Sequence, residues 1–200
     1  MNFLAHVHLS QDNEDVIFGN FIADAIKGKS YLVYRNDIVT GILLHRDIDT
    51  FTDRHVIVKR SRNRIREHFG KFSGIVVDIY YDHFLARNWY KYHNQELARY
   101  SSYIYMILAK RFLLLPNRTK RLLPFLIGQN WLVGYANFVD LDRVFGGMNR
   151  RTGRISGMEN AVKILRENYD YLYLDFVEFY SELESYSRHR LLEINQNSSK

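Results

Sequence analysis

The sequence predicts an all-α fold, with residues 1–200 forming a single-domain helical bundle. Leu, Ile, Tyr and Phe recur at three- and four-residue spacing along most of the chain, which places apolar side chains on one face of a helix. Only 2 prolines and 11 glycines occur in 200 residues, so few positions would break a helix. Apolar residues make up 46% of the chain and charged residues 25%, values typical of a globular domain. A chain of this length can bury a core that needs no disulfide.

The composition also limits the chemistry. Cysteine is absent, so the chain can form neither a disulfide nor a thiolate metal site. Any metal must be held by nitrogen and oxygen atoms, which suits Mn²⁺ or Mg²⁺ and leaves Zn²⁺ and Fe²⁺ open. The longest apolar runs, around 104–115 and 122–133, are interrupted by charged or amide residues, so we predict no membrane span. The opening residues lack the pattern of a secretion signal, and we expect a cytoplasmic protein.

A net charge of +6 and a pI near 9.4 predict attraction to polyanions. The simpler alternative is that the excess lysine and arginine only keep the protein soluble. Basic residues are concentrated in 59–71, where a helix would present an arginine-rich face to an acidic partner; its members are Arg60, Arg62, Arg64, Arg66 and Lys71. Aromatic residues that could stack on bases are scarce in this segment, so we do not expect a nucleic-acid partner.

The first two segments each contain a candidate site residue. Residues 2–10 could form a helix or run extended, and His6 within them is either a buried histidine bonded to a backbone carbonyl or a metal ligand. The apolar run 16–26 follows a polar capping segment and reads as a helix. Asp24 lies inside this run, where an isolated carboxylate is costly, so we assign it to a functional site. Lys27 is close enough to Asp24 to meet the same ligand.

The segment 41–55 carries the clearest metal-ligand spacing. A helix that starts near Asn36 would place His45 and Asp49, four residues apart, on one face. Three apolar residues precede His45, so a solvated surface position explains this histidine poorly. Arg46 and Arg54 are interleaved with the acids and could clamp a phosphate.

A second run, 74–86, repeats this pattern. Asp78 and Asp82 are again four residues apart on an expected helix, and His83 directly follows. Charges among such apolar neighbours cost several kcal/mol each unless they are paired or coordinated. We therefore expect a ligand between the two runs.

These segments together supply a nitrogen and oxygen ligand set from three expected helices. The predicted metal set is Asp24, His45, Asp49, Asp78, Asp82 and His83, with Asp49 and His83 as ligands or as residues that orient ligands; Asp24, His45 and Asp78 are the predicted catalytic residues. Lys27, Arg46 and Arg54 are the predicted phosphate-binding residues. The chemistry indicated is metal-assisted hydrolysis of a phosphate ester, although aspartate-rich helices also occur as simple ion-pair networks.

The remaining segments are less informative. Tyrosines between 88 and 105 have the spacing of core or interface packing. The glycine-bounded turn 146–153 contains Arg150 and Arg151, but it lacks the strand-to-helix context of a phosphate-binding loop. We expect a last long helix over 158–190 that closes the bundle.

Taken in order, the motifs closely resemble those of the acyl carrier protein phosphodiesterases over nearly the whole chain. The resemblance is carried by MNFLAH at 1–6, Gly19-Asn20, Asp24, Lys27-Gly28, HRxIDxFTDxH at 45–55, GIVVD at 74–78, DHFLA at 82–86, Trp131-Leu132, Tyr135 and Arg150-Arg151-Thr152.

The resemblance implies a cytoplasmic, all-helical hydrolase of lipid metabolism and fatty acid biosynthesis, distantly related to the HD-domain phosphohydrolases. It also implies a divalent metal cofactor, Mn²⁺ by preference, with Mg²⁺ or Fe²⁺ as alternatives. The reaction implied is removal of the 4′-phosphopantetheine arm from the serine of holo acyl carrier protein, which leaves the apo protein.

Two departures limit what can be carried over. HD-domain enzymes are named for adjacent His-Asp, whereas the adjacent pair here is Asp82-His83, so the ligands above are assigned by spacing. Val56 follows His55 where the family leads us to expect proline. Two alternatives remain, namely a metal phosphohydrolase that acts on another phosphodiester or nucleotide, and a non-catalytic basic helical binding module. The sequence gives no indication of oligomeric state.

Overall fold

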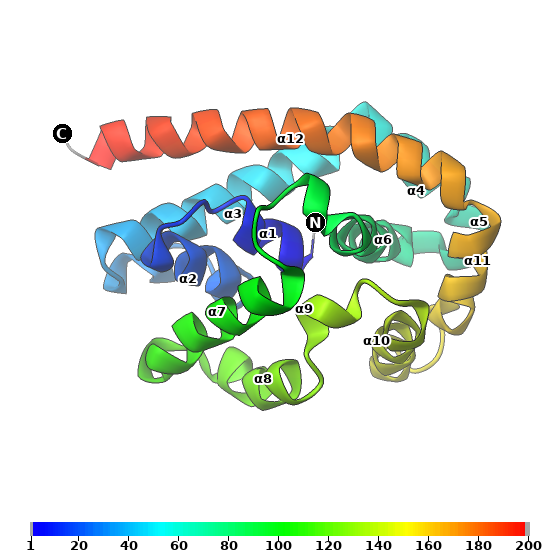
Figure 1. Cartoon of the computed structure of the whole chain (residues 1–200), viewed down its shortest axis with the longest axis horizontal. Helices are drawn as coiled ribbons and strands as arrows, with labels where there is room; N and C mark the ends of the chain where they lie inside the picture. The colour runs from blue at the N-terminus through cyan, green and yellow to red at the C-terminus, as the bar shows by residue number, and fades with distance from the viewer. Residues whose placement is uncertain (1, 199–200) are drawn as a thin grey trace.

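The computed structural model describes residues 2–198, with side chains through residue 196, and within this range it contains helices and no strand (Figure 1). The all-α prediction is therefore confirmed. The α-helices are α1 Phe3–His8, α2 Glu14–Ile22, α3 Asn36–Arg54, α4 Val56–Arg64, α5 Arg66–Phe69, α6 Ser73–Arg87, α7 Leu97–Lys110, α8 Asn117–Gly128, α9 Trp131–Gly134, α10 Phe138–Arg151, α11 Ala161–Glu167 and α12 Tyr169–Ser198. The 3-10 helices are η1 Ala23–Ala25, η2 Ser30–Val33, η3 Gly70–Phe72, η4 Trp89–Lys91, η5 Phe112–Leu114 and η6 Met158–Asn160.

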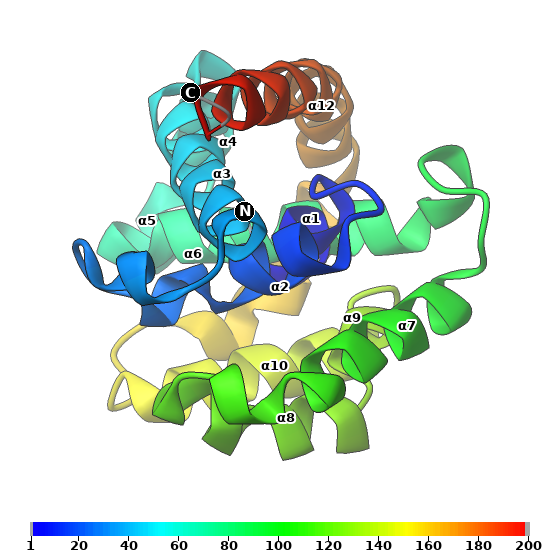
Figure 2. The same cartoon turned by 90° about the vertical axis from the view of Figure 1, so that its left-hand side faces the viewer.

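The helices pack around one connected core. The long helix α12 runs along one edge of the molecule and packs on α3 and α4, while α6 passes through the middle (Figure 1). Helices α7, α8 and α10 lie on the opposite side (Figure 2). Aromatic rings fill the contact between α6 and α12, where Tyr81 packs edge-on against Phe176. None of the described helices combines the length and the apolar character needed to cross a membrane.

Several helix boundaries differ from those expected from the sequence. Asn13 caps α2 by accepting hydrogen bonds from the backbone N–H groups of Asp15 and Val16, and the α-helix ends at Ile22, so Asp24 lies in η1. The basic segment 59–71 is divided among α4, α5 and η3. The expected helix 158–190 is interrupted at Asn168, whose side chain donates to the Ile164 carbonyl and so competes with the helical hydrogen bonds.

Two glycines allow α2 and α3 to cross in backbone contact. A Cβ atom on Gly19 would lie 2.0 Å from the carbonyl oxygen of Ile38, and one on Gly41 would lie 2.1 Å from that of Val16. No side chain can be accommodated at these distances without moving a helix. The two glycines therefore fix the separation of α2 and α3, the helices that carry most of the candidate site.

We expect Gly41→Ala to destabilise the protein by about 3 kcal/mol, because the new methyl group must push α2 and α3 apart. Gly128→Ala in α8 is the matched control, since a Cβ there meets nothing within 4 Å and alanine favours a helix. Urea denaturation followed by circular dichroism measures both variants. Equal stability of Gly41→Ala and the wild type would contradict this account of the crossing.

Candidate metal centre

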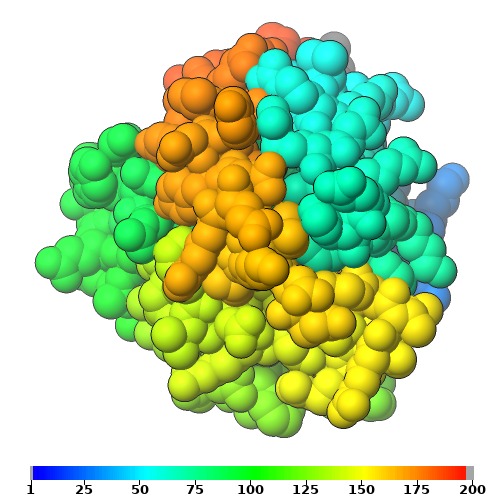
Figure 3. Space-filling model, turned by 90° about the vertical axis from the view of Figure 1, so that its right-hand side faces the viewer, coloured from blue at the N-terminus to red at the C-terminus, as the bar shows by residue number. Residues whose placement is uncertain are grey.

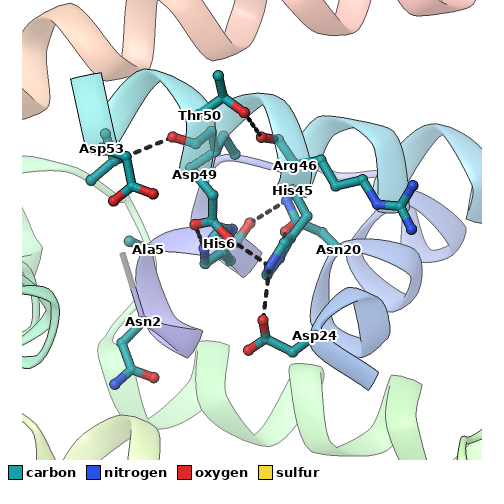
Figure 4. Close-up of polar contacts among 12 residues, drawn as sticks. Asn2, Ala5, His6, Asn20, Asp24, His45, Arg46, Asp49, Thr50 and Asp53 are labelled. Atoms are coloured by element: carbon teal, nitrogen blue, oxygen red, sulfur yellow. Dashed lines mark hydrogen bonds and ion pairs between the residues drawn. The ribbon is translucent and has the colours of Figure 1, made fainter. Parts of the chain in front are cut away.

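Two histidines and two aspartates from separate elements converge at one place (Figure 4). His6 comes from α1, His45 and Asp49 from α3, and Asp24 from η1. Nε2 of His45 lies 3.3 Å from Oδ1 of Asp24 and 3.2 Å from Oδ2 of Asp49, and Nε2 of His6 lies 3.2 Å from Oδ1 of Asp49. The two imidazole rings stack with centroids 3.9 Å apart. This group is referred to below as the histidine–aspartate cluster.

The cluster is buried on one side and open on the other. The side chains of His6 and His45 are only 4% and 7% exposed, whereas those of Asp49 and Asp24 are 41% and 65% exposed. The imidazoles are therefore the buried part of the cluster, and the carboxylates are its solvent-exposed part. A solvent-borne phosphate ester could reach such a site without any opening of the fold.

Asn20, which is fully buried on α2, orients both histidines. Its carbonyl oxygen accepts a hydrogen bond from Nδ1 of His45 at 3.0 Å, so Nε2 is the nitrogen turned toward the carboxylates. Its amide nitrogen donates to the His6 backbone carbonyl and to the hydroxyl of Ser10. Metal-binding histidines in proteins are commonly held through their second ring nitrogen in this way.

The two imidazoles have opposite electrostatic environments. Burial and the neighbouring His45 lower the pKa of His6 to about 4. Burial alone would lower the pKa of His45 as well, but the hydrogen bonds that His45 donates to Asp24 and Asp49 raise it to about 9. The hydrogen bond to His45 lowers the pKa of Asp24, and both histidines hold that of Asp49 below its usual range despite burial. At neutral pH, His45 therefore carries the positive charge of the cluster, His6 is neutral, and both aspartates are ionised.

The donor atoms fit a divalent cation. The ligand atoms of His6, His45 and Asp49 lie within 4.8 Å of one another. Nδ1 of His6 is buried without a hydrogen-bond partner in the described chain, while Nε2 lies 3.2 Å from Oδ1 of Asp49. A cation that replaced the proton on His45 would contact both imidazoles and Asp49, with Asp24 beside His45. Imidazole nitrogen and carboxylate oxygen donors suit Mn²⁺, Fe²⁺ or Zn²⁺.

Asp82 lies outside the cluster and binds the backbone at the start of α1. Its carboxyl group is fully buried on α6 and accepts hydrogen bonds from the backbone N–H groups of Leu4 at 2.8 Å and of Ala5 and Asn2 at 3.3 Å. Burial raises its pKa to about 7, and these hydrogen bonds oppose the rise. Asp82 therefore fastens the start of α1, the helix that carries His6, and its oxygen atoms are occupied by backbone groups.

His83 is also directed elsewhere. Its Nδ1 donates to the carbonyl oxygen of Tyr135 at 2.7 Å, and its ring stacks on Phe138. Asp78 is half-buried one turn before Asp82 on α6. Among the described residues, its carboxylate does not join the ligand atoms that His6, His45 and Asp49 bring together. Burial raises the pKa of Asp78, Arg62 opposes this effect, and Asp49 adds to it, which places Asp78 within electrostatic reach of the cluster.

The three predicted phosphate-binding residues lie at different places. Arg46 donates to the backbone carbonyls of Ile26 and Gly28 and covers the ring of Tyr31, and Figure 4 shows its guanidinium directed away from the histidines. It therefore fastens the loop that follows η1. Lys27 and Arg54 are exposed, the first just after η1 and the second at the end of α3.

The predicted basic face is partly engaged within the molecule. Arg60 pairs with Asp175 and Glu178, and Arg64 covers the ring of Tyr171, so both bind α12. Arg62 pairs with Asp53 at 2.7 Å. Arg60 stays exposed despite these ion pairs, as do Arg66 and Lys71, which form none within the described chain. A hollow of about 330 Å³ beside this face is lined by Asp53, Lys59, Arg62, Asn63, Arg66 and Ser73.

Sequence reasoning left His6 undecided and did not assign a role to Asn20. The placement of His6 depends on contacts with α6, some 80 positions away, and no local spacing reveals such contacts. The sequence does contain one signal for the role of Asn20. It lies inside an apolar helical run next to Gly19, and a polar residue in such a place needs hydrogen-bond partners.

The fold and the cluster define a helical protein with a surface-open histidine and carboxylate centre of the kind that binds a divalent metal. A family model described as acyl carrier protein phosphodiesterase matches residues 1–183. The chain belongs to this family.

Individual relatives agree with this assignment. A protein named acyl carrier protein phosphodiesterase from Photorhabdus laumondii is 32% identical over 181 residues, covering 90% of this chain and 91% of that protein. Proteins of the same name from Enterobacter sp. (strain 638) and from Escherichia coli are 32% and 31% identical, covering 96% of this chain and 100% of each relative. No solved structure matches the chain, so its relation to HD-domain enzymes stays a prediction.

If the cluster binds a divalent metal, Asp82→Asn is expected to weaken that binding, with Mn²⁺ as the probe, by about 10- to 100-fold, the usual effect of losing a residue that positions a metal ligand. The amide can accept backbone hydrogen bonds with only one of its two atoms, so α1 and His6 lose their fixed position. Isothermal titration of metal-stripped protein measures the affinity, and circular dichroism checks that helical content is kept. Unchanged Mn²⁺ affinity in a folded variant would contradict the anchoring role.

Acid should destabilise the fold through His83. Burial lowers the pKa of His83 to about 4, and Arg87 adds to this effect, whereas the unfolded chain takes up the proton near pH 6.5. The folding free energy contributed by neutral His83 is therefore complete above pH 6.5 and is lost as the pH falls toward 4. The free energy of unfolding, measured by urea denaturation at several pH values, should fall between pH 6.5 and pH 4. His83→Gln should reduce the slope of this fall by up to about 1.4 kcal/mol per pH unit. An identical slope in both proteins would refute this assignment.

Proposed function

We propose that this chain is a metal-dependent phosphodiesterase that removes 4′-phosphopantetheine from the serine of holo acyl carrier protein, giving the apo protein. The observation that carries the proposal is the convergence of His6, His45, Asp24 and Asp49 at a surface-open site. Membership in the acyl carrier protein phosphodiesterase family supports the choice of substrate and of hydrolysis.

The metal would be held by the histidine–aspartate cluster, with Mn²⁺ as the first candidate and Mg²⁺ or Fe²⁺ as alternatives. Such an ion would supply Lewis acidity toward the phosphoryl oxygen and toward the attacking water. Asn20 keeps Nε2 of His45 directed at the site through its hydrogen bond. Asp78 stays in the proposed catalytic set, because it lies on α6, the helix on which α1 and His6 pack.

In the reaction, water adds to phosphorus and the bond from phosphorus to the serine oxygen breaks. The serine oxygen takes a proton, and the phosphate leaves on the pantetheine arm. Lys27 and Arg54 are the proposed phosphate contacts, since both are exposed near the elements that carry the cluster. Arg46 is proposed to act indirectly by holding the loop between η1 and α3.

The carrier itself would approach over the basic face. Acyl carrier proteins are small and acidic, and Arg62 and Arg66 line the polar hollow together with Lys59. Asp53, at the same hollow, lies one helical turn beyond Asp49 on α3, so the hollow adjoins the metal centre. We propose that the serine region of the carrier is placed there in the cytoplasm, during the turnover of a protein used in fatty acid synthesis.

The test is incubation of metal-stripped protein with holo acyl carrier protein, with and without Mn²⁺, followed by intact mass spectrometry of the carrier. Loss of the phosphopantetheine mass is expected only with metal. Asp49→Asn should lower turnover by about 100-fold or more because it removes a ligand of the ion. Asp47→Asn on the same helix is the matched control, since Asp47 pairs with Arg190 away from the cluster, and it should retain turnover. An unchanged carrier with every divalent ion would refute the proposal.

A further inference from the structure

A second group of arginines lies far along the sequence from the basic face. Arg150 and Arg151 end α10, and Arg154 follows in the loop that leads to η6; all three are exposed. Within the described chain none of them forms an ion pair, in contrast to Arg60 and Arg62. Their charge is therefore available to a partner.

The loop that carries these arginines has a fixed shape. Gly153 and Gly157 adopt left-handed backbone conformations with φ of 68° and 70°, and Arg154 does so as well, with φ of 61°. The buried side chain of Asn149 holds the loop by accepting from the Ser156 hydroxyl and donating to Glu159. A left-handed conformation is unfavourable for arginine and persists only where the surroundings enforce it. The backbone that carries Arg154 is thus held in one conformation, and the Arg150 guanidinium lies beside Gly146 and Gly147 of α10.

The loop adjoins the basic face in space. A Cβ atom on Gly157 would lie 2.7 Å from the carbonyl oxygen of His68 in α5 and 3.7 Å from the ring of Phe69. Figure 3 shows α4 and α5 in cyan and teal directly beside the yellow segment that contains residues 150–157. The exposed charges of Arg66 and of the loop therefore belong to one side of the molecule.

We propose that Arg150, Arg151 and Arg154 form a second docking point for the acidic carrier protein, separate from the metal centre. The inference rests on the proposed function for the identity of the partner. Guanidinium groups bind carboxylates through two parallel hydrogen bonds, so a rigid cluster of three suits an acidic helix. Two separated points of attachment would fix the orientation of the carrier, and so direct its serine toward the cluster.

The experiment compares the double variant Arg150→Glu and Arg151→Glu with Arg118→Glu and Arg121→Glu. The control pair is exposed on α8 and changes the net charge equally. We expect the loop variant to raise KM for holo carrier about tenfold and to reduce the salt dependence of binding, with kcat within about twofold. The control pair should keep the wild-type KM.

Binding of apo carrier by isothermal titration separates this inference from the proposed function. Wild-type protein that binds apo carrier but releases no phosphopantetheine from holo carrier would refute hydrolysis, while weaker binding of the loop variant would still support docking. Equal weakening by both variants, or none by the loop variant, would overturn the docking site. Loss of duplex DNA binding in the loop variant with unchanged carrier binding would also overturn it, in favour of a nucleic-acid partner.

Discussion

The backbone contact between α2 and α3 is the constraint on which the rest of the structure depends. Gly19 and Gly41 let the two helices approach until carbonyl oxygens occupy the positions of missing side chains. At this separation the amide of Asn20 reaches His45, and η1 brings Asp24 to the same imidazole. A centre assembled in this way needs no flexible loop to bring its ligands together. Its geometry follows from main-chain packing, which is the least adjustable part of a protein.

The helical class and three of the four cluster residues could be predicted from local sequence. His45 and Asp49 share a face because they are four residues apart on one helix. Asp24 was predicted because an acid inside an apolar run is costly, but its side chain is 65% exposed, so this cost does not apply. Asp82 and His83 show the same local pattern but turn to backbone groups of α1 and of Tyr135. Spacing defines the face that a residue occupies, whereas the neighbour of that face depends on tertiary packing.

The charges at the centre explain how a buried pair of histidines can persist. Two stacked imidazolium rings would repel each other, and the protein keeps one ring neutral by burial while two carboxylates stabilise the proton on the other. The carboxylates lie at the surface, where their negative charge is partly solvated. The arrangement that holds a proton on His45 would also suit a dication, because His6, His45 and Asp49 turn donor atoms toward one another.

The anchoring of α1 by Asp82 also bears on the order of folding. The hydrogen bonds join residues 77 to 80 positions apart, so their closure requires a long loop to be ordered first. Helix α1 has only six residues and cannot persist as an isolated helix. It is ordered only by packing on α2 and α6. His6 therefore joins the centre only when α1 has docked, and a metal held by His6 would couple its capture to that docking.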